Sequence, residues 1–297
     1  MFRTLPKFEY LSPETVEDAM ALLTQHGKRA KVIAGGTDLI PEMRWGEHQP
    51  DYVLGLSRIP GLDAIQYDEA TGLKLGAMCT IARIQKSEVI KKHYPILSQA
   101  ASVLASMEIR NRATVGGNLC TAAPSADMPP SLLTLDATAV IASDGGERGL
   151  PLEQFFNGPK ETALKAGEFL IRLDMPPARP NTAGEYIKFG RRGAMEIAMI
   201  GVAALITLEP QDMVCREARL AFATAAPTPI RAKEAEKALV GKRLDPDVID
   251  SAAQTAVGEA SPRTSWRTTE EYRRHLIPVL TRRAIESAIK QIRNGSS

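Results

Sequence analysis

Residues 113–130 read ATVGGNLCTAAPSADMPP, and the interpretation of the whole chain depends on this stretch. It contains two adjacent glycines, three prolines, one Asn, one Asp and several small side chains. Such a composition suits the interior of neither a helix nor a strand. Because long irregular segments inside compact domains tend to be functional, we expect this backbone to be shaped around a ligand.

A second glycine pair strengthens this expectation. Gly35-Gly36 and Gly116-Gly117 each follow an apolar pair with β-branched side chains, and small polar residues follow both. Glycine permits positive φ and leaves backbone N–H groups uncovered, so that consecutive N–H groups can converge on one anion. Neither Gly35–Ile40 nor Gly116–Ala126 contains Lys or Arg, so we expect amide dipoles and hydroxyl groups to hold a diphosphate. The alternative is a pair of ordinary tight turns.

The usual nucleotide-binding signatures are missing from the sequence. Neither G-x-G-x-x-G nor G-x-x-x-x-G-K-[ST] occurs, which excludes the Rossmann and P-loop fingerprints. A nucleotide cofactor would therefore be bound by another fold.

Composition and charge indicate an ordinary globular protein. Of the 297 residues, 44% are hydrophobic and 24% are charged, and the formal net charge is +2, without the one-sided excess that nucleic-acid or membrane-surface binding requires. The longest apolar runs, such as VAALITL at 202–208, are far shorter than the ~20 residues of a membrane span. The N-terminus lacks the apolar region of a signal peptide. We expect a cytoplasmic protein with no nucleic-acid partner and no membrane span.

The cysteines and histidines do not form a recognisable site in the sequence. Cys79, Cys120 and Cys215 include no C-x-x-C pair, and the four histidines are dispersed. This pattern argues against a disulfide framework and against a metal or iron–sulfur site in this chain. We expect no catalytic residue and no metal ligand, and we interpret each cysteine as a small buried hydrophobic residue.

Helical and strand patterns alternate along the chain and predict an α+β fold. A linker-like segment, PPARPNTAG at 176–184, suggests a domain boundary near 178–184. The predicted helices cover residues 12–27, 37–46, 89–106, 230–240, 246–259 and 270–292. The predicted strands cover residues 31–36, 51–59, 72–80, 135–143, 167–176, 185–192, 200–208 and 217–227.

Two of these segments together resemble a known family. AGGTDLIPEMR at 34–44 and RATVGGNLCTAAPSADMPPSLLTLDA at 112–137 resemble the FAD-binding subunit, or medium chain, of the xanthine dehydrogenase/carbon monoxide dehydrogenase family of molybdenum hydroxylases. The resemblance continues through GEFLIRLDMP, EYIKFGRR, AAPTPIRAKEAEKALVG and EYRRHLIPVLTRRAI, and so it spans nearly the whole chain.

The resemblance implies a two-part architecture. Residues 1–178 would form a two-lobed FAD-binding domain of the PCMH type, shared with vanillyl-alcohol oxidase, with lobes at about 1–57 and 58–178. Residues 184–290 would form a C-terminal domain with a small antiparallel sheet and helices. FAD would lie extended between the lobes, with its diphosphate near both glycine segments.

The resemblance also implies a set of cofactor-binding residues. The first segment would supply Val32, Ile33, Ala34, Gly35, Gly36, Thr37 and Leu39, and the second would supply Thr114, Gly117, Asn118, Thr121 and Asp127. Leu104, Leu170 and Lys188 match further positions near the flavin.

For three of these residues, physical reasoning supports the cofactor-binding role or offers a structural alternative to it. Asp127 could accept hydrogen bonds from ribose hydroxyls, or it could cap a helix that begins at Met128. Lys188 near the isoalloxazine would stabilise the anionic reduced ring and raise its potential, or it could be an ordinary surface lysine. Leu104 could equally be a core residue of helix 89–106.

The function implied by the resemblance is electron transfer within a larger enzyme. A small partner subunit with two [2Fe–2S] clusters and a large molybdopterin subunit would complete the complex, which we expect to be a dimer of heterotrimers. FAD in this chain would pass electrons to NAD or another external acceptor. The alternative is a self-sufficient flavin-dependent reductase of the bacterial cell-wall precursor type. The sequence does not identify the substrate that the complex hydroxylates.

Overall fold

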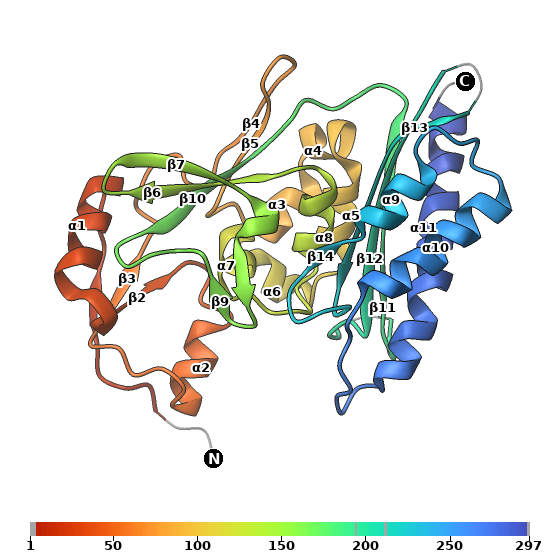
Figure 1. Ribbon diagram of the computed structural model, residues 1–297. Coiled ribbons are helices and arrows are strands. Elements are labelled where there is room, and N and C mark those ends of the chain that lie inside the picture. Colours follow the sequence, from red (N-terminus) through yellow and green to blue (C-terminus); the bar gives the residue numbers. More distant parts are fainter. Residues whose placement is uncertain (1–3, 194, 211–212, 296–297) are drawn as a thin grey trace.

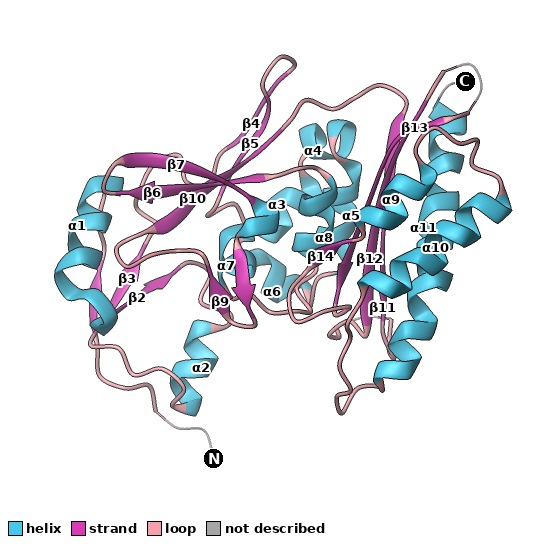
Figure 2. Cartoon of the chain, viewed as in Figure 1, coloured by secondary structure: helices cyan, strands magenta, loops and turns pink. Residues whose placement is uncertain are grey.

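The computed structural model describes residues 4–193, 195–210 and 213–295, which fold into three main sheets flanked by helices. Figure 1 follows the chain from the N-terminal sheet through the central sheet to the C-terminal sheet and its helices. Helices and strands alternate in the N-terminal part and are segregated at the C-terminus (Figure 2). The predicted α+β class is confirmed.

The N-terminal sheet has three parallel strands in the order β1-β3-β2, namely Glu9–Leu11, Tyr52–Gly55 and Ala30–Ile33. Helix α1 (Val16–His26) begins at Thr15, whose hydroxyl accepts the N–H of Asp18, and it ends at Gly27, where a 3₁₀ turn (Gly27–Arg29) leads into β2. Helix α2 (Leu39–Trp45) follows the first glycine pair. We call these elements the N-terminal lobe.

The central sheet is antiparallel, with five strands in the order β4-β5-β10-β6-β7. Its strands are Ile65–Asp68, Gly72–Gly76, Phe169–Met175, Thr138–Ser143 and Gly146–Pro151. The helices associated with it are α3 (Ile81–Lys86), α4 (Glu88–His93), α5 (Pro95–Val103), α6 (Met107–Arg112), α7 (Val115–Cys120) and α8 (Met128–Thr134). A 3₁₀ turn (Leu152–Gln154) and a small hairpin, β8 (Phe156–Gly158) with β9 (Glu161–Thr162), complete this part.

Two local predictions are wrong. The single helix predicted over 89–106 is divided into α4 and α5 at Tyr94, because Pro95 cannot continue a helix from the preceding residues but suits a first helical position. The stretch 113–130, predicted to be irregular, contains α7 and α8. Both glycines of the second pair lie in the first turn of α7, and two of the prolines lie in the first turn of α8, where neither residue type disrupts a helix.

The C-terminal sheet is antiparallel, in the order β11-β12-β13-β14. Its strands are Thr182–Phe189, Ile200–Leu208, Cys215–Ala223 and Ile230–Arg231. Helices α9 (Lys233–Leu239), α10 (Pro246–Glu259) and α11 (Glu270–Gly295) pack on one side of the sheet, and α5 and α8 pack on the other. Because helices cover both faces, every residue of β12 is buried.

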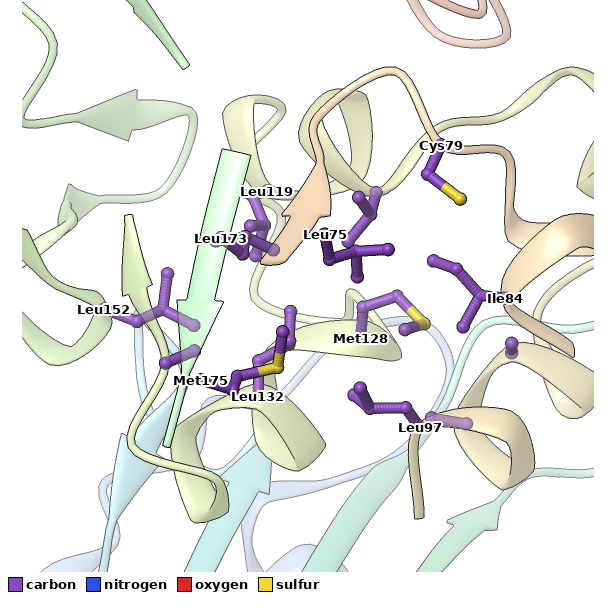
Figure 3. Close-up of a cluster of buried hydrophobic side chains, with 14 of the residues drawn as sticks. Leu75, Cys79, Ile84, Leu97, Leu119, Met128, Leu132, Leu152, Leu173 and Met175 are labelled. Atoms are coloured by element: carbon purple, nitrogen blue, oxygen red, sulfur yellow. The ribbon is translucent and has the colours of Figure 1, made fainter. Parts of the chain in front are cut away.

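One hydrophobic core joins the central helices to two sheets. Figure 3 shows Leu75 of β5 and Leu173 of β10 on one side and Met128 and Leu132 of α8 on the other. The same core includes Tyr186, together with side chains of β12 and β13. The C-terminal sheet therefore packs directly against α5 and against α8, the helix that follows the second glycine pair, and strand β11 lies at its edge.

Candidate functional site

A cleft of about 760 Å³ lies between the N-terminal lobe and the central part of the chain. Thirteen of the fifteen residues predicted to bind the cofactor line it, so segments far apart in the sequence do meet at one place. These thirteen are Val32, Ala34, Gly35, Gly36, Thr37, Leu39, Leu104, Thr114, Gly117, Asn118, Thr121, Asp127 and Leu170.

The other two predicted residues, Ile33 and Lys188, lie behind the wall of the cleft. The Ile33 side chain packs beneath Gly36, where an added Cβ would be 3.1 Å from Ile33 Cδ1. Lys188 is buried next to Asp127. Both residues support neighbours that do line the cleft.

The first glycine segment offers backbone donors to the cleft. Among the described residues, the N–H groups of Gly36, Thr37 and Asp38 have no protein acceptor. Gly36 has a φ of +73°, a conformation that glycine adopts at little cost. Gly35 is in contact with the end of α6, since an added Cβ would lie 2.1 Å from the Arg112 carbonyl oxygen. This segment fits the expected amide cradle for an anion.

The second glycine segment does not offer backbone donors in the same way. The N–H of Gly116 donates to the carbonyl of Ala77 over 2.8 Å, and the N–H of Gly117 donates to the Thr114 hydroxyl over 3.0 Å. The N–H of Asn118 donates to the Thr114 carbonyl. The prediction that both glycine pairs supply free N–H groups is therefore wrong for this pair, because its amides form the first turn of α7 and its link to Ala77.

Side chains of the second segment face the cleft instead. Asn118 lines the cleft, and its buried Oδ1 has no hydrogen-bond partner. The Thr121 hydroxyl contacts the Gly117 carbonyl at 2.9 Å and the Asp38 carboxylate at 3.4 Å, which links the two segments directly. An unpartnered buried amide beside free backbone donors is the arrangement that a polar cofactor would satisfy.

Asp127 is held by two residues of the C-terminal sheet. The Tyr186 hydroxyl donates to Asp127 Oδ1 over 2.9 Å, and Lys188 Nζ donates to Oδ2 over 2.8 Å. The side chains of Asp127 and Lys188 are only 8% and 7% exposed. Burial raises the pKa of Asp127, and the contacts with Lys188 and Tyr186 offset part of that increase. Burial, with Asp127 beside it, also raises the pKa of Tyr186, which remains a hydroxyl donor.

The ion pair corrects two interpretations of these residues. Asp127 does stand at the start of α8, but its side chain makes no capping hydrogen bond, so the capping alternative is wrong. Lys188 is neither a surface lysine nor an isolated cation, since its charge is neutralised by Asp127. Because Asp127 and Lys188 are in direct contact, they cannot lie at opposite ends of an extended ligand.

Leu104 combines the two roles that the sequence left open. It is 6% exposed, it belongs to the central core, and it also lines the cleft. The Arg110 guanidinium donates to the carbonyls of Leu104 and Ala105 over 2.9 and 3.1 Å. These bonds hold Ala105 at a φ of +44°, which is unusual for a residue other than glycine.

One cation in the cleft wall was not found from the sequence. Lys160, at the turn of the β8–β9 hairpin, lines the cleft and pairs with Glu42 at 3.1 Å and Glu47 at 2.8 Å. These pairs connect the hairpin to α2 and its following turn, which lie close together in Figure 1. No local motif marks Lys160, because its position depends on a hairpin far along the chain from both glycine segments.

The cysteines follow the prediction only in part. Cys79 and Cys215 are buried, whereas Cys120 lines the cleft, so its interpretation as a buried hydrophobic residue is wrong. The residue as a whole is exposed, and burial of its sulfur among neighbouring atoms raises the pKa of the Cys120 thiol to about 12. Within the described ranges, no cluster of His, Cys, Asp or Glu could hold a metal ion, and no helix could cross a membrane.

Comparison with known proteins agrees with this geometry. The FAD binding domain in molybdopterin dehydrogenase matches residues 6–178, which contain both glycine segments. The chain belongs to the FAD-binding subunits of the molybdenum hydroxylases. The CO dehydrogenase flavoprotein C-terminal domain matches residues 185–288, the part of this FAD subunit that holds Asp127 from β11.

Relatives of this FAD subunit match it over nearly their whole length. The xanthine dehydrogenase FAD-binding subunit of Escherichia coli O157:H7 is 34% identical over 94% of this chain and 95% of its own. The carbon monoxide dehydrogenase medium chain of Afipia carboxidovorans is 32% identical over 97% and 98%. A chain of the Cu,Mo-CO dehydrogenase crystal structure superposes with a TM-score of 0.92, at 31% identity over 97% of this chain and 99% of that chain.

Proposed function

We propose that this FAD subunit collects electrons from an iron–sulfur partner and passes them through FAD to an external acceptor. The observation that carries the proposal is the single cleft lined by both glycine segments, in a chain whose relatives are FAD subunits of dehydrogenases. The part of the chain that the structure describes contains no candidate metal cluster. In this proposal the protein binds and tunes the cofactor, while substrate oxidation takes place in another subunit.

The fifteen predicted residues would contact or support different parts of the cofactor. The free N–H groups of Gly36 and Thr37, with the Asn118 Nδ2–H and Thr121 hydroxyl groups, would donate to the diphosphate, and the unpartnered Asn118 Oδ1 would accept from a cofactor hydroxyl. Ala34, Leu39, Leu104 and Leu170 would provide apolar contacts. Val32, Gly35, Thr114 and Gly117 would shape the wall, and Ile33 would support it.

Asp127 and Lys188 would act as a unit. A carboxylate has about four acceptor positions, so Asp127 can accept a ribose hydroxyl while it remains bonded to Tyr186 and Lys188. Lys188 would keep Asp127 ionised and oriented, and it would not contact the isoalloxazine as an isolated cation. This assignment replaces the direct effect of Lys188 on the flavin potential.

When bound, FAD supplies the chemistry that converts single-electron transfers into a two-electron transfer. The residues of this chain would hold it, exclude water from its buried parts and leave one edge accessible. We propose domain boundaries at 178 and 184, a small [2Fe–2S] subunit and a large molybdopterin subunit as partners, and a dimer of heterotrimers. NAD or another external acceptor would take the electrons, and the cytoplasm is the expected location.

The proposal is tested by co-expressing the chain with its two partner subunits and purifying the complex. We expect stoichiometric FAD and bleaching of the flavin absorbance when a panel of purines, N-heterocycles and aldehydes is added. Absence of flavin, or absence of bleaching with every reducing substrate of the complex, would contradict the proposal. Bleaching of the isolated chain by one organic substrate would favour the self-sufficient reductase instead.

A further inference from the structure

Exposed apolar side chains gather beside the cleft. Eleven large hydrophobic side chains are exposed in the described part of the chain, and six of them belong to α5, α6, the β11–β12 turn and the connection between α10 and α11. These six are Val103, Met107, Ile109, Met195, Ile197 and Trp266. Single exposed hydrophobic residues are common, but a gathering of this kind marks an interaction surface.

The first five of these side chains belong to α5, α6 and the β11–β12 turn, and we call them the apolar rim because α6 and the turn each contribute a residue to the cleft lining. Ile109 and Ile197 line the cleft itself, so the rim is continuous with the cofactor site. Val103 is tied to β11 through its carbonyl, which accepts a hydrogen bond from Lys188 over 3.2 Å. Met195 and Ile197 belong to the turn between β11 and β12.

A basic and aromatic surface adjoins this rim. The guanidinium of Arg191, in the β11–β12 turn, donates to the carbonyl of Arg267, in the connection between α10 and α11. Both connections lie at the lower end of the C-terminal sheet in Figure 1. The Arg267 guanidinium stacks on the Trp266 ring at 4.4 Å, and Trp266 is 79% exposed. We call Arg191, Arg263, Arg267 and Trp266 the basic–aromatic patch.

The charge of the patch is not neutralised within the described residues. Arg191, Arg263 and Arg267 form no ion pair there, and neither does Arg273, which is buried below them. Burial, with Arg263 and Arg267 nearby, lowers the pKa of Arg273. Glu196, in the same turn as Arg191, accepts backbone N–H groups but keeps its charge, and Glu270 pairs with Arg274, so the three unpaired guanidinium groups outnumber this one unpaired carboxylate. The patch therefore carries a net positive potential.

The form of this surface favours a protein over a small molecule. None of the residues of the basic–aromatic patch lines the 760 Å³ cleft, so a nucleotide would find no enclosed subsite there. Trp and Arg are the residues most enriched at the energetic centres of protein interfaces. An apolar centre flanked by unpaired cations matches a partner that presents carboxylates around an apolar patch.

We propose that the apolar rim and the basic–aromatic patch form the docking surface for the electron-delivering iron–sulfur subunit, which presents an acidic border around an apolar centre. This inference rests on the proposed function, and it specifies which surface of the chain would bind the iron–sulfur subunit and by what chemistry. A partner seated on the rim would cover the mouth of the cleft and approach the cofactor there. Charge attraction would increase the rate of association and make it sensitive to salt.

The test uses the full chain, co-expressed with its partner subunits. Arg191→Glu/Arg267→Glu reverses the charge of the patch, and Trp266→Ala removes its exposed ring without changing charge. The matched control is Arg243→Glu/Arg283→Glu, because both arginines are exposed and neither forms an ion pair within the described residues. Melting temperature and FAD content are measured for every variant, together with the dissociation constant for the iron–sulfur subunit at two salt concentrations.

We expect the patch variants to keep their FAD and to bind the iron–sulfur subunit at least about tenfold more weakly, with a reduced dependence on salt. The control should bind like the wild type. Unchanged association in both patch variants would overturn the inference, and so would a loss of affinity for NADH with normal association of the subunit. If the wild-type complex forms through this patch but its flavin is never reduced, the proposed function fails while the docking surface stands.

Discussion

The two glycine segments contain the same dipeptide, but they serve the site in different ways. In the first, Gly36 adopts a positive φ and the following amides have no protein acceptor among the described residues. In the second, Gly116 and Gly117 lie inside a helical turn, and their amides bond to the protein. The first segment offers its backbone to a ligand, whereas the second offers side chains held by a closely packed backbone.

This difference shows that a glycine pair does not specify one mechanism. Glycine at Gly36 is needed for its conformation, while glycine at Gly116 is needed because an added Cβ would lie 2.7 Å from the Ala77 carbonyl oxygen. In the proposed site, the second segment would contact the cofactor through side chains such as Asn118 and Asp127. Variants of the two segments should therefore separate backbone effects from side-chain effects.

The largest effect is expected at Asp127. Asp127→Asn should abolish tight FAD binding and destabilise the chain by about 3 kcal/mol, because it leaves Lys188 buried without a counter-charge. Chemical denaturation and flavin titration measure the two losses. Lys188→Met on the Asp127→Asn background should restore most of the stability but not the FAD affinity. Recovery of both would show that Asp127 does not contact the cofactor.

The next effect is expected in the first segment. Gly35→Ala should destabilise the chain by about 2 kcal/mol, because the backbone at Arg112 must move to accept the new Cβ. The measurement is urea denaturation of the apoprotein. Gly27→Ala is a control at the other end of β2, because Gly27 precedes this strand, Gly35 follows it, and an added Cβ at Gly27 has nothing within 4 Å. The control carries only the strain of its positive φ.

A smaller effect, on FAD affinity and not on the stability of the fold, is expected in the second segment. Gly117→Ala adds a Cβ that meets Thr114 Oγ1 at 3.0 Å and Ala34 Cβ at 3.8 Å, so the fold can adapt. FAD affinity should fall by about tenfold, equivalent to ~1.4 kcal/mol, with an unchanged melting temperature of the apoprotein. Wild-type FAD affinity in this variant would remove Gly117 from the site.

The smallest effect on stability is expected at the ion pair between Glu168 and Arg148, which serves as a comparison for the more deeply buried pair of Asp127 and Lys188. Arg148 holds the pKa of Glu168 below its usual value of 4.5, so this carboxylate stabilises the fold above pH 4.5 and the contribution is lost as pH falls through its folded-state pKa. Glu168→Gln should cost about 1 kcal/mol at pH 7 and progressively less on acidification. Denaturation curves from pH 7 to well below pH 4.5 measure this trend, and a cost that does not change with pH would contradict it.

The sequence was sufficient for features that depend on local patterns. Strand β12 and helices α10 and α11 follow from apolar spacing, and the glycine segments indicated a ligand cleft. The sequence was not sufficient for contacts between distant elements. Nothing in the spacing placed Tyr186 on Asp127 or Lys160 in the cleft wall, because each contact depends on how two sheets or a hairpin and a helix pack together.

The short helices α7 and α8 show a second reason why the sequence did not predict part of the structure. In α7 and α8, glycine and proline occupy first turns, so residues that usually end helices instead begin them. Composition alone cannot distinguish these cases, since the outcome depends on capping groups such as the Thr114 hydroxyl. The same composition that indicated a functional region therefore gave the wrong local structure.

Because strand β11 comes late in the chain, cofactor binding depends on how far translation has proceeded. Both groups that hold Asp127 in place, Tyr186 and Lys188, leave the ribosome after every other predicted cofactor-binding residue. A nascent chain that ends before β11 has the glycine segments but lacks the counter-charge for Asp127. Retained flavin would then report that the chain was translated through to its last sheet, so incomplete products would remain colourless and open to proteolysis.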